Sequence, residues 1–360
     1  MAIKYLGSKR VLVPVLGDLL AASEATTALD LFTGTTRVAQ EFCRQGAFTT
    51  AVDLATYSEV LAQCYVEIDA NTIDRTEVAA AIKHLQSLPP VRGYVTETFC
   101  EASRYFHPKN GERIDAIREG IDEHYGDSRL RPILLTSLME AADAVDSTVG
   151  LQMAYLKQWA PRALNDLTMK IPEFTPNSGR AVRGDATELV HSLPRVDLAY
   201  LDPPYNQHRY FTNYHIWETL VRWDKPEHYG VACKRIDARD PSTKSVFNAK
   251  RDMPPALAET IKNVDADVVM VSFSNEGYVP LADLIEMTRA RGNPVEVLAF
   301  DSKRYVGALI GIYNPSGDKV GSVSHTRNTE YVILSGDADR IQQMADKVLH
   351  KTQQTADTLF

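Results

Sequence analysis

The chain has 360 residues, of which 44% are hydrophobic and 24% are charged, as is usual for a soluble globular protein with a substantial core. Lys and Arg total 39 against 47 Asp and Glu, and the formal net charge of -8 excludes a protein that coats nucleic acid by bulk positive charge, although it allows a local basic face. The four cysteines form no closely spaced pair, which argues against a zinc ribbon or a disulfide scaffold and favours a reducing cytoplasm.

The first predicted elements form a strand–helix–strand unit. A helix is expected from about Leu12. The apolar run Thr26–Phe32 predicts a buried parallel strand, and residues 34–46 have helical spacing with Gly46 as the stop. A second strand, FTTAVD, ends in Asp53. The apolar stretch after Lys9 is interrupted by proline and aspartate, and no apolar run reaches the ~18 residues of a membrane span, so no membrane partner is expected.

The rest of the chain predicts inserted helices followed by more strands. Residues 58–165 carry apolar residues mostly at helical spacing. Strands are expected at 180–185, 196–202 and 266–274, a helix at 278–291, and an antiparallel pair at 294–300 and 329–335. Residues 311–328 are expected to be a connection, and the tail after residue 337 a polar surface helix. The segment 224–254 has no clear periodicity and is the most basic stretch, which is typical of a functional loop.

This alternation predicts an α/β fold, a Rossmann-like, mostly parallel twisted sheet with an inserted helical region. We assign residues 1–57 and 178–336 to the α/β domain, 58–177 to the helical insertion and 337–360 to the C-terminal surface helix. Ligands of such sheets bind at the carboxyl ends of the strands. Asp30, Asp53, Asp185 and Asp202 all lie at or near such ends, so the sequence places a site there.

The strongest motif is DPPY, residues 202–205, directly after an apolar strand. Pro203 and Pro204 cannot continue a central strand and stiffen the chain where it leaves the sheet. A rigid turn there can present the Asp202 carboxylate, the Pro203 carbonyl and the Tyr205 ring to one ligand. Two neighbouring acceptors suit an exocyclic amine, and the ring suits stacking on the base that carries it. The alternative is an ordinary turn with a surface tyrosine.

With these residues the chain resembles the DPPY-type amino-methyltransferases, and closely the adenine-N6 DNA methyltransferases of the D12 (Dam-like) class. The resemblance covers most of the chain. It is carried by KYLGSK (4–9), DLFTGTTRVAQEF (30–42), Asp53, AADAVDSTVGLQMAYLKQW (141–159), DPPYNQHRYFTNYHIWETL (202–220) and SFSNEG (272–277). One departure concerns the loop pattern FxGxG, in which Thr36 replaces the second glycine.

The resemblance implies S-adenosylmethionine as the cofactor, bound by the first domain. The expected cofactor residues are Tyr5, Lys9, Asp30, Phe32, Gly34, Asp53, Asp185 and Asp202. Tyr5 and Lys9 are expected at the methionine end, where Lys9 can pair with the carboxylate. Asp53 could accept both ribose hydroxyls, and Asp185 could accept from the adenine amine, cap the following helix, or do both. A dinucleotide is the competing ligand, but GxGxxG is absent.

On the substrate side, Asn206 and Tyr210 are expected to help Tyr205 hold a flipped base. The phosphate-contacting candidates are Lys234, Arg235, Lys250 and Arg251, with a solvated loop as the alternative. Base readout could instead use Arg104, Lys109, Arg113, Arg129 and Arg131 of the insertion. His208 and His215 suggest a general base, which an amine attacking a sulfonium does not need.

We therefore predict a site-specific, S-adenosylmethionine-dependent DNA methyltransferase that acts on adenine N6. No metal is required. Its partner is double-stranded DNA with the target adenine flipped out, and a cognate restriction endonuclease is a candidate second partner in a restriction-modification system. The alternatives are a cytosine-N4, RNA-adenine or protein-glutamine methyltransferase, and a catalytically silent DNA-binding regulator.

Overall fold

The computed structural model describes residues 3–5, 9, 12–176, 179–303, 312–313, 319–321 and 327–357. Leu6, Gly7 and Ser8 of the KYLGSK motif and most of the connection predicted at 311–328 lie outside these residues. Among the described residues, no helix is both long and apolar enough to cross a membrane.

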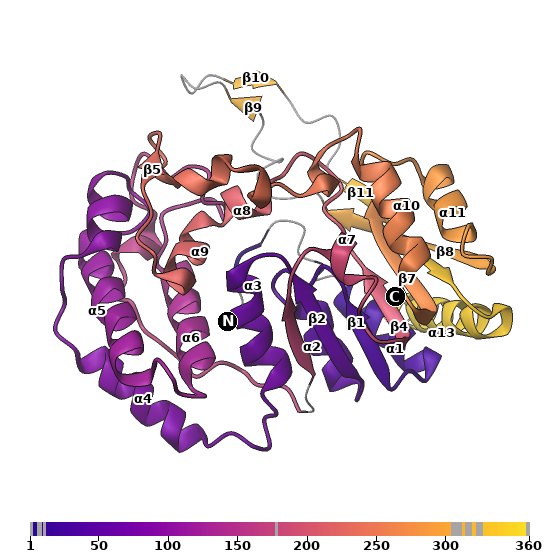
Figure 1. The fold of residues 1–360 in the computed structure, drawn as a ribbon, viewed down its shortest axis with the longest axis horizontal. Helices are drawn as coiled ribbons and strands as arrows, with labels where there is room; N and C mark the ends of the chain where they lie inside the picture. Colours follow the sequence, from indigo (N-terminus) through magenta and orange to yellow (C-terminus); the bar gives the residue numbers. More distant parts are fainter. Residues whose placement is uncertain are drawn as a thin grey trace.

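The centre of the molecule is a seven-stranded sheet with the order β3-β2-β1-β4-β7-β11-β8 (Figure 1). Its strands are β1 (Thr27–Asp30), β2 (Phe48–Asp53), β3 (Arg180–Arg183), β4 (Val196–Leu201), β7 (Ala266–Ser274), β8 (Val295–Lys303) and β11 (Arg327–Ser335). Neighbouring strands from β3 to β7 are parallel, whereas β11 is antiparallel to both β7 and β8. The structure confirms the mostly parallel α/β sheet and the terminal antiparallel pair.

The order of the strands creates a crevice at one end of the sheet. From β1 the chain builds β2 and β3 to one side, then returns to place β4 and β7 on the other side. Because the connections diverge between β1 and β4, the carboxyl ends of these two strands border the crevice in which such sheets bind ligands. The central strands are buried apolar runs, such as ADVVMVSFS in β7, since both of their faces are covered.

Helices cover both faces of the sheet. The bounds are α1 (Val13–Ser23), α2 (Arg37–Arg44), α3 (Thr56–Ala62), α7 (Ala186–Leu189), α10 (Met253–Asn263), α11 (Leu281–Arg289) and α13 (Ala338–Asp357). One face packs against α1, α2 and α13, which share a core with Leu198 and Met270. The opposite face packs against α7, α10 and α11, which share a core with Leu201 and Val271. Helix α11 is shorter than predicted and begins after Pro280, which occupies its N-cap.

The insertion forms a helical half beside the sheet, at the left of Figure 1. It contains α4 (Arg75–Ser87), α5 (Pro108–Tyr125) and α6 (Arg131–Ala144), with α-helices interrupted by π-helical turns at 63–67 and 96–101. The helix after the DPPY turn, α9 (His215–Arg222), packs in this half, where Trp217 and Leu220 join its core. The fully buried Arg118 donates hydrogen bonds to the carbonyls of Leu220 and Val221. The division of domains stays a prediction, but the core of the helical half includes this later helix.

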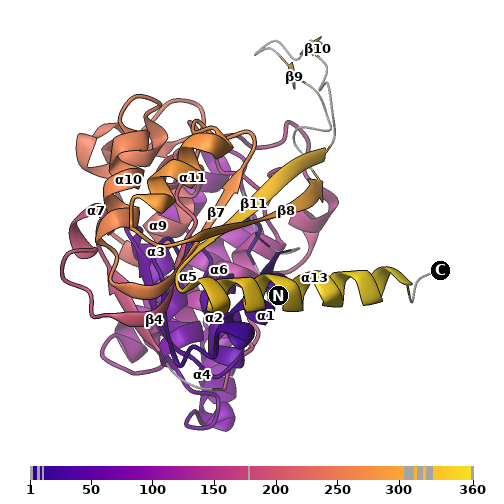
Figure 2. The ribbon, with the colours of Figure 1, turned by 90° about the vertical axis from the view of Figure 1, so that its right-hand side faces the viewer.

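The C-terminal helix α13 differs from the polar surface helix that we expected. Figure 2 shows it lying along the molecule beside α1. Its outer face is exposed, but Ile341, Met344, Ala345 and Val348 are buried on its inner face. These apolar residues recur three or four positions apart, so they form one stripe of the helix. The helix is therefore part of the core.

We expect Met344→Ala to lower the free energy of unfolding by about 2–5 kcal/mol, because the Met344 side chain is fully buried between α13 and the sheet. The matched control is Gln343→Ala on the exposed face of the same helix, which should change it by less than about 0.5 kcal/mol. Urea denaturation measures both variants. Equal stability of the two would show that α13 does not pack as described.

Candidate active site

Three acidic residues meet at the carboxyl edge of the sheet. Asp30 ends β1, Asp53 ends β2, and Asp202 follows β4 directly. Since β1 pairs with β2 on one side and with β4 on the other, these residues border the crevice as the sequence predicted. Each carboxylate then has a different environment, which decides what it can do.

Asp53 holds the loop between β1 and α2. Its Oδ2 accepts a hydrogen bond from the Gly34 amide at 2.8 Å and its Oδ1 accepts from the Ala55 amide at 3.0 Å. Gly34 has a φ of +52°, and a Cβ there would lie 3.1 Å from the Tyr5 ring, so the turn requires glycine. Burial raises the pKa of Asp53, and these amide hydrogen bonds oppose the rise.

Asp30 supports the same loop from below. Its side chain is 1% exposed, and its Oδ2 accepts a hydrogen bond from Thr33 Oγ1 at 2.9 Å, while Oδ1 has no hydrogen-bond partner. Burial raises the pKa of Asp30 to about 7, helped by the nearby Asp202 and Asp53 carboxylates. The expectation that Asp30 contacts the cofactor is therefore corrected, because the residue lies beneath the loop.

A pocket of about 910 Å³, counting the space open to solvent, runs along this edge. Its lining includes Tyr5, Leu31, Phe32, Gly34, Asp53, Leu54, Ala55, Gly184, Asp185, Ala186, Asp202, Pro204, Tyr210, Phe211, Thr243, Ser245, Phe247 and Asn248. The structure thus brings together Tyr5, Phe32, Gly34, Asp53 and Asp185 with Asp202. Asp185 also caps α7, since its Oδ1 accepts from the Thr187 amide at 2.8 Å.

The DPPY turn is held between the pocket and β7. Pro203 is buried, and the half-buried Tyr205 ring packs against Phe273 at 5.4 Å between centroids. The Tyr205 carbonyl accepts a hydrogen bond from the Tyr278 amide at 3.0 Å. Burial raises the pKa of Asp202 to about 6, Lys9 opposes this rise, and Glu330 adds to it.

Lys9 lies at the DPPY turn with two acidic neighbours. Its Nζ is 3.1 Å from Asp202 Oδ1 and 2.9 Å from Glu330 Oε2, and the side chain is only 6% exposed. The ammonium also lies 5.5 Å from the centroid of the Tyr205 ring. Pairing of Lys9 with a cofactor carboxylate stays a prediction that this geometry does not favour, because two carboxylates already share the cation.

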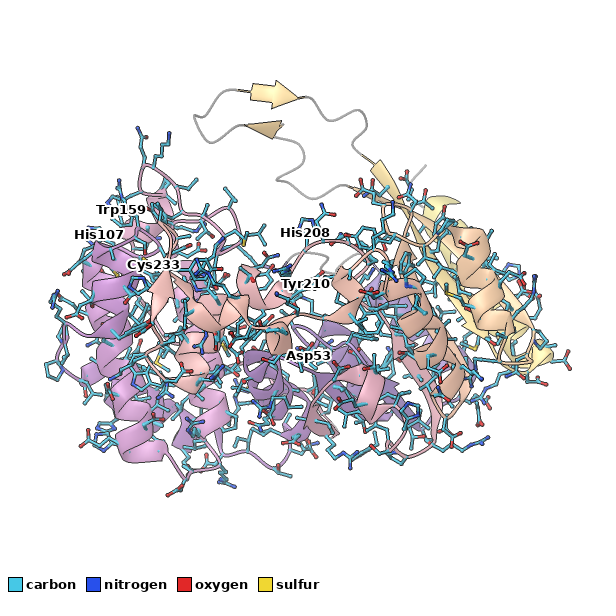
Figure 3. All side chains as sticks on the ribbon, turned by 45° about the horizontal axis from the view of Figure 1, so that its top comes forward. Asp53, His107, Trp159, His208, Tyr210 and Cys233 are labelled. Atoms are coloured by element: carbon cyan, nitrogen blue, oxygen red, sulfur yellow. The ribbon has the colours of Figure 1, made fainter. Side chains whose placement is uncertain are left out.

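Aromatic rings join the N-terminal segment to the segment after DPPY. Tyr5 stacks on Tyr210 at 5.3 Å and on Tyr214 at 4.5 Å between centroids. Tyr5 and Tyr57 hydroxyls form a hydrogen bond of 3.3 Å. Tyr210 is therefore part of the pocket wall, and its predicted contact with a flipped base remains a prediction. Figure 3 shows Tyr210 and Asp53 in the middle of the molecule, between the helical half and the sheet half.

Residues 243–248 form a pocket wall that sequence reasoning missed. Phe247 packs edge-on against Phe32 at 5.0 Å between centroids. Asn248 Nδ2 donates to the carbonyls of Asn206 and His208, both at 2.9 Å, and so fixes the turn after DPPY. The sequence signal was hidden because these residues lie within the basic stretch, where we weighed only charge.

Arg235 is not a surface cation. Its side chain is 1% exposed, and its guanidinium donates to Asp224 and Asp237 at 2.7 Å. The prediction that Arg235 contacts phosphate is wrong, because two neighbouring acids neutralise it inside the fold. Lys234 is partly buried, and burial lowers its pKa. Lys250 and Arg251 are exposed and remain candidates.

The two histidines near the turn do not suit proton transfer. His215 is fully buried, its Nε2 lies 3.0 Å from the Gln152 carbonyl, and burial lowers its pKa to about 3. His208 is half-buried, and burial lowers its pKa as well. Neither side chain belongs to the pocket lining described above.

Comparison with known families decides the identity. The model of the D12 class N6 adenine-specific DNA methyltransferases matches residues 5–270, which is most of the chain. The chain belongs to this family. The resemblance stated from the motifs is thereby confirmed, together with an enzyme acting on adenine N6 in DNA rather than on cytosine, RNA or protein, or a silent regulator.

Individual relatives of this methyltransferase are modification enzymes. It is 27% identical over 315 residues to the type II methyltransferase M.NlaIII of Neisseria lactamica, covering 85% of this chain and 88% of the relative. It is 27% identical over 330 residues to M.CviAII of Paramecium bursaria Chlorella virus 1, covering 87% and 95%. It is 28% identical over 304 residues to the modification methylase StsI of Streptococcus sanguinis, covering 79% of this chain but 46% of that relative, so it spans about half of that protein.

We expect Arg235→Ala to lower the free energy of unfolding of this methyltransferase by about 3 kcal/mol, because Asp224 and Asp237 lose a buried partner. The double variant Lys250→Ala/Arg251→Ala should instead keep the stability within about 1 kcal/mol. If these two residues contact phosphates, it should weaken DNA binding and flatten the salt dependence by about 1 per contact. Denaturation and DNA titration at several salt concentrations measure this. A stable Arg235→Ala variant with a flattened salt slope would reverse the assignment.

Proposed function

We propose that this chain transfers the methyl group of S-adenosylmethionine to N6 of an adenine that is rotated out of duplex DNA. The observation that carries the proposal is one continuous pocket with Asp53 and Asp185 along its length and Asp202 of the DPPY turn in its wall. A cofactor held by the first two carboxylates would then adjoin the residue that receives the target amine.

The chemistry of the pocket fits this cofactor. Three of its described lining residues, Asp53, Asp185 and Asp202, are acidic, whereas none of them is Lys or Arg. Carboxylates repel the phosphates of a dinucleotide but attract the positive charge of a sulfonium compound. Phe32, Leu54 and Phe247 supply apolar walls for a purine ring. When bound, S-adenosylmethionine supplies an electrophilic methyl group on a positively charged sulfur.

Two acidic residues have free acceptor capacity for this ligand. Each Asp53 oxygen accepts one backbone amide hydrogen and retains a second lone pair, which suits the two ribose hydroxyls. Asp185 Oδ1 accepts from Thr187, which leaves acceptor capacity for the adenine amine while the carboxylate caps α7. Tyr5 and Gly34 close the pocket between these groups.

At the reacting end, the DPPY turn offers two hydrogen-bond acceptors and one aromatic face. The Asp202 carboxylate and the Pro203 carbonyl accept the two N–H groups of the target amine, which turns the nitrogen lone pair away from conjugation with the ring. Tyr205 stacks on the base. The rigid turn, held by Phe273 and Tyr278, fixes this orientation before the substrate arrives. Orientation and electrostatics then account for most of the catalysis.

The DNA surface and the second partner are also part of the proposal. Lys250 and Arg251 are exposed beside the pocket-lining residues 243–248, so phosphates bound there would lie near the site. We infer that the enzyme protects sites recognised by a cognate restriction endonuclease, as expected for a relative of type II modification enzymes. An endonuclease blocked by DNA that this chain has methylated would support that partner.

We expect Asp202→Asn to reduce methyl transfer by about 100-fold or more, because the amide presents N–H groups where the target amine also has N–H groups. Single-turnover transfer to duplex DNA measures the rate. Asp283→Asn on the exposed surface of α11 makes the same change of charge and should leave the rate unchanged. Equal rates for the two variants would exclude Asp202 from the reaction.

The cofactor site is tested by Asp53→Ala, which should weaken S-adenosylmethionine binding by about 1–3 kcal/mol through the lost hydrogen bonds. Calorimetry on the purified variant measures the affinity, with Asp283→Ala as the control. Unchanged affinity would show that Asp53 only fastens the loop at Gly34.

A further inference from the structure

Glu330 belongs to the site by position but lies outside the residues that define the family. The family model ends at residue 270, and Glu330 stands on β11, across β7 from the DPPY strand β4. It pairs in register with Ser274, at the end of β7. Its side chain is 12% exposed, and it reaches the same ammonium group that touches Asp202.

The two carboxylates share Lys9 unequally. The Lys9 ammonium donates a hydrogen bond to Glu330 Oε2 at 2.9 Å. It lies 3.1 Å from Asp202 Oδ1, but that buried oxygen has no hydrogen-bond partner. The cation is therefore close enough to stabilise the Asp202 charge, while its hydrogen bond is directed to Glu330.

We propose that Glu330 is a positioning residue for the methyl-transfer reaction: it draws the Lys9 ammonium aside, so that Asp202 stays charged and keeps Oδ1 open for the target amine. The inference rests on the proposed role of Asp202. A carboxylate that paired fully with Lys9 would be equally charged but would offer one acceptor fewer, so the amine would have to displace the lysine before it could bind.

The other groups around Asp202 do not supply this balance. The titratable and charged side chains that face it are Lys9 from the N-terminal segment, Glu330 from β11, Tyr205 from the turn, Tyr200 from β4, Asp30 from β1 and Tyr210 from the segment after the turn. Among these described groups Lys9 is the cation, and burial raises the pKa of each of the three tyrosines, which keeps them neutral. The ionisation of Asp202 therefore depends on how strongly Lys9 engages it.

The test is the pH profile of single-turnover methyl transfer for Glu330→Gln and Lys9→Gln. Without Glu330, Lys9 pairs with Asp202, so the acidic limb should move to lower pH by about one unit while the plateau rate falls about ten-fold. Without Lys9, burial of Asp202 is unopposed, so the acidic limb should move to higher pH. Glu286→Gln, which neutralises an exposed acid on α11, is the control and should change neither quantity.

Opposite shifts in the two variants support the proposal, whereas a merely structural role would move the limb the same way in both or in neither. A Glu330→Gln profile equal to that of Glu286→Gln would overturn it, even with Asp202→Asn inactive and the proposed function intact. Carbon-13 titration of Asp202 in the unmodified protein needs no variant. A pKa near 6 agrees with the proposal, and one at or below the ordinary value of 3.8 contradicts it by indicating full pairing with Lys9.

Discussion

Repulsion between carboxylates at one end of the sheet is the constraint on which the site depends. Parallel strands bring Asp30, Asp53 and Asp202 to the same edge, and β11 adds Glu330. Each carboxylate is accommodated differently. Backbone amides bind Asp53, burial raises the pKa of Asp30 to about 7, and Lys9 is shared by Asp202 and Glu330. The remaining negative charge faces the pocket, where a cationic cofactor would be stabilised.

The same edge connects the two halves of the molecule. The chain leaves β4 through the DPPY turn and enters α9, whose apolar residues are part of the core of the helical half. Tyr5 stacks on Tyr210 and Tyr214 across this junction, and Asn248 fastens the turn from the opposite side. The position of the target base and the packing of the insertion are therefore set by one short segment, which explains why the catalytic turn must be rigid.

Much of this site follows from the sequence, because strand patterns and turn residues act locally. Asp53 and Asp202 could be placed since parallel strands end at one edge, and the turn at Gly34 was visible from its glycine. At Thr36, where the family pattern has glycine, the backbone keeps a φ of +62°. The substitution therefore leaves the turn in its left-handed form although threonine disfavours it.

The errors arose from pairings that sequence patterns do not encode. Arg235 looked like a free cation because counting charges does not reveal that Asp224 and Asp237 fold around it. The Lys9–Glu330 pair joins residues 321 positions apart, across strands whose order cannot be read from spacing. The apolar stripe of α13 was overlooked because the helix is polar on average, although one side of it is buried.

The central claim is that this pocket directs a methyl group to N6 of adenine in duplex DNA. Mass spectrometry of nucleosides from duplex DNA that has been incubated with the purified protein and isotope-labelled S-adenosylmethionine tests it most directly. The account predicts labelled N6-methyladenine as the modified nucleoside. Labelled N4-methylcytosine, or no labelled nucleoside from a folded protein, would contradict it.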